Sequence, residues 1–444
     1  EEIRIKIKSM FKHAYDSYFY NAFPLGNLKP LSCRGGKFEL SRIKMLTLID
    51  SLDTLYILNN HTEFVRGIER LREFDVINEG FFRQDENVSV FETNIRALGG
   101  LIGAHFLADE GLDVNINDIW EYDNILLKLM IDLGDRLLPA FNTPTGIPYG
   151  TVNLIHGVPA GETKIASLAG AGSLSLEMEV LSRLTGNGVY GRVGRKSVEG
   201  LWRRRNAETG LVGKHVDVST GHWVESVSGI GSNSDSFFEY LLKYSILFPE
   251  HSGFWIMFQD VWSGVEEHVK VGVWYGDVDM ARGNKGGSRT RFESLASFLP
   301  GLQVLLGELG EASKSLNAFY AVRSKYNFLP ERFDYEAWDV EGGGGQHPLR
   351  PEIYESAYLL GRALKTINPL EDAIRDIDKY TRTPCGFASI ENVVTKKLAD
   401  DMPSYFLSET LKYLYLAFDD DNKIHDKGAG WIFTTEAHPI KWLP

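Results

Sequence analysis

A cation and two carboxylates lie close together in a segment that proline stiffens. The segment runs Gln346-His347-Pro348-Leu349-Arg350-Pro351-Glu352-Ile353-Tyr354-Glu355-Ser356. Its prolines predict an extended, stiff backbone at Leu349 and Arg350, and Pro351 suits the first turn of a helix. Glu352 and Glu355 then share one helical face. The segment is suited to acid–base chemistry, although an acidic first turn also stabilises a helix through its dipole.

Three other apolar helices are predicted to begin close to acidic residues in the same way. Glu92 precedes the apolar run 97–107, Asp235 precedes 237–247, and Glu409 precedes 411–415. Helices that repeat with one polarity bring such ends to a common mouth. A ring of carboxylates around one opening is costly unless it binds a ligand or performs acid–base work. This recurrence favours a site over four separate helix starts.

Apolar residues at helical spacing predict an almost entirely helical chain that positions these acids. The predicted helices cover residues 10–19, 45–56, 92–107, 123–138, 166–184, 190–205, 237–247, 254–269, 292–306, 312–326, 353–364, 369–380 and 404–418. Alternation around Thr220 and Gly221 predicts a β-hairpin over 215–225. Neither the first nor the last helix has the polar outer face of a solenoid cap. The pattern therefore favours an all-α closed (α/α) toroid over an open solenoid.

Three carboxylates inside the predicted helices need an explanation of their own. Asp50 and Asp53 lie among apolar neighbours in the helix over 45–56, so they require buried partners. Glu177 is surrounded by leucine, methionine and valine, which fits a buried structural carboxylate as well as a site residue. Gly99, Gly100 and Gly103 follow Glu92 and allow close contact with another helix.

Composition excludes several classes of partner. The chain has 444 residues, 43% of them hydrophobic, which is ample for a large core. No linker divides it, so residues 1–444 are expected to form a single domain. The formal net charge of -13 argues against nucleic acid or an anionic membrane as the main partner. No apolar run is long enough to span a bilayer.

The cysteines and two sequons bear on the compartment. Cys33 and Cys385 are the two cysteines of the chain. They are either free buried thiols or a disulfide that closes a very long loop, which would require an oxidising compartment. Asn60-His61-Thr62 and Asn87-Val88-Ser89 are glycosylation sequons, and such triplets support a secretory location only weakly.

Five motifs, in chain order, carry a resemblance to a known family. They are Phe91-Glu92-Thr93-Asn94-Ile95-Arg96, Asp235-Ser236-Phe237-Phe238-Glu239-Tyr240-Leu241-Leu242, Phe298-Leu299-Pro300-Gly301, Leu349-Arg350-Pro351-Glu352 and Phe433-Thr434-Thr435-Glu436-Ala437-His438-Pro439. Together they resemble the class I α-1,2-mannosidases, glycoside hydrolase family 47. The motifs around Cys33, Asn327, Gln346 and Cys385 resemble the ER degradation-enhancing α-mannosidase-like subgroup. The resemblance implies an (α/α)7 barrel, a Cys33–Cys385 disulfide and the lumen of the endoplasmic reticulum.

The resemblance also implies roles for individual residues. Glu92 matches the acid that protonates the departing glycosidic oxygen, and Glu352 matches the proposed base that activates water. Asp235 and Glu331 match further catalytic carboxylates. Thr435 matches the direct protein ligand of Ca2+. The residues expected to hold the other Ca2+ ligands or the sugar are Arg96, Glu177, Arg350, Glu355, Tyr405, Glu409 and Glu436.

The implied chemistry is inverting hydrolysis. An inverting glycosidase needs an acid on one face of the bond and a base with water on the other, roughly 6.5–9.5 Å apart. Ca2+ takes oxygen ligands in flexible number, so it can hold sugar hydroxyls and water together. Asn233 and Glu293 depart from the family pattern, where arginine and aspartate are expected, and both departures concern the substrate cleft.

Three functions follow from this reading. The first is trimming of α-1,2-mannose from high-mannose N-glycans on misfolded glycoproteins, beside a protein disulfide isomerase-type partner. The second is a lectin-like or chaperone-like binder with little turnover. The third is an unrelated (α/α) toroid, such as another glycosidase or a cyclase. The complete set of acids favours the first.

Overall fold

The computed structural model describes residues 1–111, 120–366, 370–426, 428 and 430–443. Its longer helices are α1 (Glu2–Asn21), α2 (Leu46–Ile57), α3 (His61–Ile77), α5 (Gly99–Asp109), α6 (Ile125–Leu137), α8 (Ser175–Thr185), α9 (Gly188–Trp202), α10 (Asp235–Leu247), α11 (Gly253–His268), α13 (Leu309–Tyr326), α14 (Glu352–Leu364) and α15 (Leu370–Thr381). Shorter helical segments are α4 (Val90–Glu92), η1 (Thr93–Leu98), η2 (Leu138–Phe141), α7 (Leu168–Gly172), η3 (Asn284–Gly286), η4 (Ser294–Phe298), α12 (Leu299–Leu305), η5 (Phe406–Thr410), α16 (Leu411–Leu416) and η6 (Lys423–His425).

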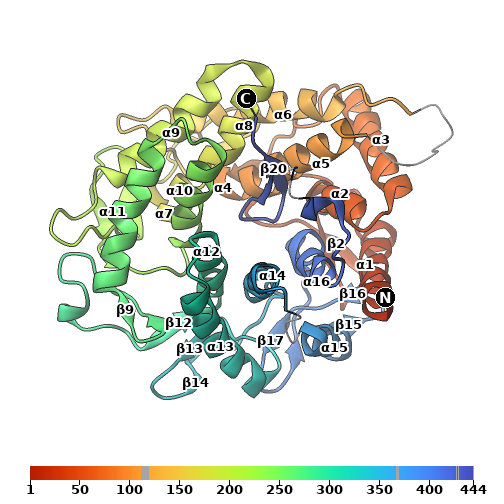
Figure 1. Cartoon of the computed structure of the whole chain (residues 1–444). Coiled ribbons are helices and arrows are strands. Elements are labelled where there is room, and N and C mark those ends of the chain that lie inside the picture. Colours follow the sequence, from red (N-terminus) through yellow and green to blue (C-terminus); the bar gives the residue numbers. More distant parts are fainter. Residues whose placement is uncertain (112–119, 367–369, 427, 429, 444) are drawn as a thin grey trace.

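The helices form two concentric rings (Figure 1). Within the described ranges, seven inner helices follow one another around the ring in the order α2, α5, α8, α10, α12, α14 and α16. Helix α10 contacts η4, which leads into α12, and η5, which leads into α16, packs on α2 to close the ring. Most inner helices pair with an outer helix that neighbours them in sequence, such as α8 with α9 and α10 with α11. This is the (α/α)7 barrel expected from the resemblance.

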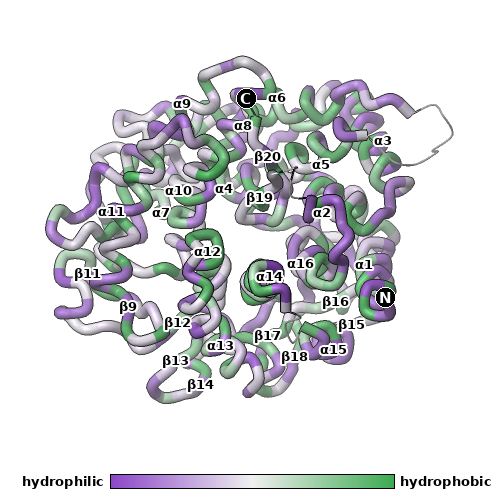
Figure 2. Tube along the Cα trace, viewed as in Figure 1, coloured by the Kyte–Doolittle hydropathy of each residue, from purple (hydrophilic) through white to green (hydrophobic). Residues whose placement is uncertain are grey.

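Burial follows the two rings. Every residue of α2 is buried, and all of α5 except Asp109 is buried, as an inner helix requires. Outer helices are amphipathic instead. In Figure 2 the inner helix α14 is mainly green, whereas α15 on the outside is mainly purple. Hydrophobic burial between the rings is the main source of stability in such an arrangement.

Short antiparallel strands form hairpins and ribbons between the helices. They are β1 (Asn27–Lys29), β2 (Arg34–Gly36), β3 (Asn87–Ser89), β4 (Thr151–Asn153), β5 (Ile165–Ser167), β6 (His215–Asp217), β7 (Trp223–Glu225), β8 (Val227–Ser228), β9 (Lys270–Val271), β10 (Trp274–Tyr275), β11 (Val278–Asp279), β12 (Arg291–Glu293), β13 (Arg332–Asp334), β14 (Asp339–Val340), β15 (Arg382–Thr383), β16 (Gly386–Phe387), β17 (Ile390–Asn392), β18 (Lys397–Leu398), β19 (Trp431–Phe433) and β20 (Pro439–Lys441). The predicted hairpin is β6–β7, in which His215 pairs with Glu225. The β19–β20 hairpin lies inside the ring and packs on α5 (Figure 1).

The structure corrects several local predictions. Helix α3 was not predicted, although Asn60 caps it by accepting a hydrogen bond from the Glu63 amide. The predicted helix over 166–184 is divided into β5, α7 and α8, and the one over 292–306 begins as strand β12. Leu349 is not extended, since its φ is 59°. Tertiary contacts hold it there, because its side chain is fully buried and its carbonyl accepts from the Thr410 hydroxyl at 2.7 Å. Residue 369, predicted to begin a helix, lies outside the described residues.

A disulfide joins the first and last parts of the ring. Cys33 in the β1–β2 turn is bonded to Cys385 between β15 and β16, with Cα atoms 5.5 Å apart, which confirms the predicted pair. The same two loops are also held by the Thr383 hydroxyl, which donates to the Pro30 carbonyl at 3.1 Å. The bond closes a loop of 352 residues.

We expect Cys33→Ser to lower the apparent Tm by several degrees and to reduce activity, although no catalytic group changes. The entropy model for so long a loop allows about 6 kcal/mol of stabilisation, and measured values often fall below it. Differential scanning fluorimetry measures the shift, and Ser32→Ala on the same loop is the matched control. A Tm equal to that of the control would show that the bond does not constrain the ring.

Candidate active site

A cavity of about 410 Å³ opens where the N-terminal ends of the inner helices converge. Its lining includes residues from α4, α7, α10, η4, α14 and η5, as well as the β19–β20 turn. Ten of the residues predicted from the sequence line it: Glu92, Arg96, Asp235, Arg350, Glu352, Glu355, Tyr405, Glu409, Thr435 and Glu436. The prediction that acidic helix starts meet at one mouth agrees with this geometry.

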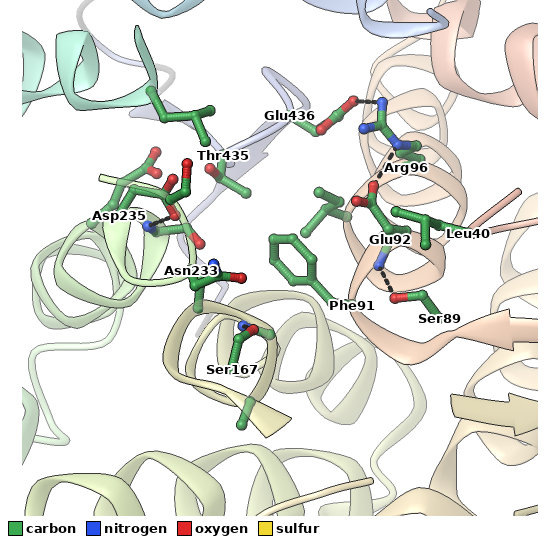
Figure 3. A pocket seen from close by; sticks show the side chains of 18 of the residues that line it. Leu40, Ser89, Phe91, Glu92, Arg96, Ser167, Asn233, Asp235, Thr435 and Glu436 are labelled. Atoms are coloured by element: carbon green, nitrogen blue, oxygen red, sulfur yellow. Dashed lines mark hydrogen bonds and ion pairs between the residues drawn. The ribbon is translucent and has the colours of Figure 1, made fainter. Parts of the chain in front are cut away.

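One wall of the cavity carries Glu92. The hydroxyl of Ser89 caps α4 by accepting from the Glu92 amide at 3.3 Å. Arg96, one turn later in the π-helix η1, donates from Nε to Glu92 Oε2 at 2.9 Å and also bonds Glu436 (Figure 3). Single π-helical turns are frequent at functional sites, because they redirect a side chain that a regular helix would point elsewhere. Arg96 therefore fixes two carboxylates of the cavity at once.

Asp235 lies on the opposite side of the cavity from Glu92 (Figure 3). It is the first residue of α10, and its Oδ1 accepts from the Ser236 amide at 2.7 Å. Burial, together with the nearby Glu239 carboxylate, raises the pKa of Asp235 to about 7. The two walls thus present carboxyl groups in different electrostatic settings, which is the arrangement that acid–base catalysis uses.

Glu352 and Glu331 differ in how they are paired. Arg350 binds Glu331 through two hydrogen bonds, Nε to Oε1 at 2.9 Å and Nη2 to Oε2 at 3.0 Å. Burial opposes ionisation of Glu331, but Arg350 outweighs it and lowers its pKa. Glu352 is 3.9 Å from Arg350, and its buried Oε2 has no hydrogen-bond partner among the described residues. Burial raises the pKa of Glu352 to about 8.

Glu331 and Glu177 lie outside the cavity lining. Glu331 stands behind Arg350 and also accepts from the Ser294 hydroxyl at 2.6 Å. Glu177 is fully buried, where it accepts from Asn94 Nδ2 at 2.8 Å and from the Tyr240 hydroxyl. The Tyr240 hydroxyl in turn faces the backbone of Thr435. Glu331 therefore acts on the cavity through Arg350 and through its charge, which raises the pKa of Glu352, whereas Glu177 reaches the cavity through Tyr240.

The floor of the cavity carries more carboxyl groups than cationic side chains. Its lining contains seven carboxylates, from Glu92, Asp235, Glu239, Glu352, Glu355, Glu409 and Glu436, and two guanidinium groups, from Arg96 and Arg350. Burial raises the pKa of Glu409 well above its usual value, and the neighbouring Glu436 raises it further. Lys243, itself buried, bonds Glu239 and lies 3.7 Å from Glu355.

Comparison with known proteins shows which family the chain belongs to. The family profile described as Glycosyl hydrolase family 47 matches residues 10–442. The chain is a family 47 glycosyl hydrolase. It is 42% identical to ER degradation-enhancing alpha-mannosidase-like protein 2 of Homo sapiens, over 98% of this chain and 77% of that protein. It is 41% identical to Alpha-mannosidase I MNS4 of Arabidopsis thaliana, over 100% of this chain and 70% of that protein.

The solved structures agree on the fold. The alpha-1,2-mannosidase from Trichoderma reesei superposes with a TM-score of 0.86, covering 100% of this chain and 99% of its own, at 24% identity. Membership of family 47 makes the chain a glycosidase. None of the helices in the described part of the chain is long and apolar enough to cross a membrane.

Sequence reasoning missed two members of this glycosidase site. Glu239 lines the cavity, and Lys243 pairs with it one turn later on α10. Both lie in the run 235–247, so their spacing of four was visible. The signal was weak, because a Glu–Lys pair at that spacing is also common on exposed helices. In the structure both side chains are buried beside the cavity, which the sequence did not show, and this burial distinguishes the Glu239–Lys243 pair from an exposed one.

The residues present fit the Ca2+ that the family resemblance implies. Among the described residues, no three His, Cys, Asp or Glu side chains are grouped closely enough to hold a metal by themselves. The cavity instead offers oxygen donors only: the Thr435 hydroxyl and carbonyl and the surrounding carboxylates. Oxygen donors with several water ligands suit Ca2+. The buried Oε2 of Glu352 has no hydrogen-bond partner among the described residues, and the cavity lining holds more carboxyl groups than cationic side chains. A bound cation would satisfy both.

We expect metal-free protein to lose thermal stability as pH rises from about 5.5 to about 8.5. Burial raises the pKa of Glu177 to about 7 and that of Glu352 to about 8. Burial lowers the pKa of His438, but Asp53 and Asp50 outweigh it and raise this pKa to about 9. In this window the folded state binds more protons than the unfolded state, so stability falls as pH rises.

Scanning fluorimetry in EDTA across this pH range measures the effect. Glu352→Gln removes one titrating group, so it should flatten the slope. Added Ca2+ should raise Tm most at the alkaline end, because it favours the ionised carboxylates. A metal-free Tm that is constant or rises with pH would contradict the raised pKa values of Glu177, Glu352 and His438.

Proposed function

We propose that this chain is an α-1,2-mannosidase that removes terminal mannose from high-mannose N-glycans. The observation that carries the proposal is the pair of opposed walls, with Glu92 on one side and Asp235 on the other, in one cavity of a family 47 chain. Phe91, Phe298 and Tyr405 line the same cavity, and Phe91 offers a ring face for the apolar side of a sugar. Tyr405 is held between Arg96 and Arg350, whose guanidinium carbons lie 5.2 and 5.8 Å from its ring.

The proposed mechanism is inverting. Glu92, oriented by Arg96, protonates the glycosidic oxygen as the bond to it breaks. Glu352 accepts a proton from the water that attacks the opposite face of the anomeric carbon. Asp235 stabilises positive charge that develops on the sugar, and Arg350 keeps Glu331 ionised beside it. Bound Ca2+ would supply coordination sites for water and sugar hydroxyls, next to Thr435.

Three observations support a location in the secretory pathway. Related chains are named ER degradation-enhancing proteins, the disulfide suits an oxidising lumen, and the sequon residues Asn60 and Asn87 are exposed. We therefore place a single catalytic unit in the endoplasmic reticulum lumen, acting on misfolded glycoproteins before degradation. A protein disulfide isomerase-type partner stays a prediction, which co-purification with and without reductant tests.

Mannose release from a high-mannose glycoprotein, folded and unfolded, tests the function. We expect release of α-1,2-linked mannose, abolished by EDTA and restored by Ca2+, with β-mannose as the first product by NMR. Glycan binding without release would support the lectin-like alternative. Release that is unaffected after complete removal of metal would remove Ca2+ from the mechanism.

A further inference from the structure

The turn that carries Thr435 stands on a buried cluster of four charged side chains. His438 closes the turn, and Asp50, Asp53 and Lys412 complete the cluster, all four with no exposed surface. His438 Nδ1 bonds Asp53 Oδ2 at 2.7 Å, and its Nε2 bonds Asp50 Oδ1 at 3.1 Å. Since both ring nitrogens face carboxylate oxygens, both carry hydrogen and the ring is a cation.

Lys412 connects the same cluster to the backbone of the turn. Its Nζ donates to Asp53 Oδ1 at 2.9 Å and to the Ala437 carbonyl at 2.6 Å. Ala437 has a φ of 60°, in the left-handed region that side chains other than glycine rarely adopt. Inside the turn, the Thr434 hydroxyl accepts from the amides of Glu436 and His438 at 3.3 and 3.1 Å. The conformation at Ala437 is therefore fixed from two sides.

Helix α5 leaves room for this cluster. A β-carbon at Gly99 would lie 2.8 Å from the His438 ring, and one at Gly103 would lie 2.8 Å from Asp53 Oδ2. Because Gly99 and Gly103 have no β-carbon, the β19–β20 hairpin and its charged cluster can pack against α5 inside the ring. Arg96 links the cluster to the cavity, because its Nη1 bonds Glu436 and lies 3.8 Å from Asp50 Oδ2.

We infer that Asp50, Asp53, Lys412 and His438 are positioning residues that hold the hydroxyl and carbonyl of Thr435 in the arrangement a Ca2+ ion requires. The inference rests on the proposed function, which places Ca2+ at Thr435. A buried ionic cluster adds little net stability compared with apolar packing, whereas it fixes geometry strongly. Two oxygens from one residue can serve one ion only if the backbone and χ1 of that residue are both held.

The test measures Ca2+ affinity by isothermal titration calorimetry on chelator-treated full chain, together with the metal-free Tm. We expect Asp53→Asn to weaken Ca2+ binding at least about 10-fold, because one amide cannot accept from both His438 and Lys412. Asp376→Asn is the matched control, since Asp376 is also buried and accepts from a buried cation, Arg323 Nη2, at 2.9 Å. The control should lose Tm but keep its Ca2+ affinity within about twofold.

The outcomes separate this inference from the proposed function. Wild type that binds no Ca2+ overturns the inference and removes Ca2+ from the proposed mechanism, whereas the mannosidase activity itself stands or falls with mannose release. Wild type that binds, with Asp53→Asn equal to it in affinity and merely lower in Tm, shows that the cluster is structural and overturns the inference alone. Asp50→Asn keeps an acceptor for His438 Nε2 but removes the charge that pairs with the ring, so it takes the place of Asp53→Asn if that variant does not fold, and the same criteria apply. Thr435→Val provides the reference for loss of the hydroxyl ligand itself.

Discussion

Glu92→Gln should reduce mannose release by about 10³-fold while the fold and glycan binding are retained. The glutamine has nearly the same shape and can still accept the Arg96 Nε hydrogen bond through its carbonyl oxygen. It has no proton to give to the departing glycosidic oxygen, and a positioned general acid contributes about 10²–10⁴ in rate. The loss should appear in kcat, with the Kd for a high-mannose glycan close to that of wild type.

A matched variant separates proton donation from the loss of an ion pair. Glu199 on the exposed face of α9 and Arg203, the residue after its end, form a Glu–Arg pair at the same i,i+4 spacing, 3.3 Å apart. Glu199→Gln removes that pair far from the cavity, and its rate should equal that of wild type. If Glu92→Gln released mannose at a wild-type rate, Glu92 would not be the acid.

The sequence predicted the convergence of the acids because that feature depends on local signals. Proline and acidic residues at helix starts, followed by apolar periodicity, are readable without tertiary information. Glu92, Asp235 and Glu352 were found in this way, and they line one cavity. The number of inner helices was predicted from the family resemblance, because hydrophobic periodicity does not show how many helices the inner ring contains.

Features set by long-range contacts could not be read from the sequence. Asp50 and Asp53 were expected to need partners, but those partners, Lys412 and His438, lie more than 350 residues away. The left-handed Leu349 is stabilised by Thr410 in the next inner helix, against the local preference set by its prolines. Likewise, β12 replaces a predicted helical turn because it pairs with β13, whose other edge pairs with β14. Tertiary pairing overrides local propensity at such positions.

Removing the Glu352 side chain should be as damaging as removing the acid, with a loss of about 10³-fold in kcat for Glu352→Ala. Glu371 is the matched control, because it is an exposed glutamate in the first turn of α15, as Glu352 is in the first turn of α14. If Glu352 merely favoured a helix dipole, Glu352→Ala and Glu371→Ala would both have small effects.

Azide then identifies the base by chemical rescue. In Glu352→Ala the lost side chain leaves space on the face that water attacks, and azide needs no base to act as a nucleophile. We expect azide to restore turnover of an activated α-mannoside and to yield β-mannosyl azide, the product of a single displacement with inversion. NMR of the product distinguishes the two anomers. Rescue of Asp235→Ala but not of Glu352→Ala would transfer the role of base to Asp235, whose burial likewise raises its pKa to about 7.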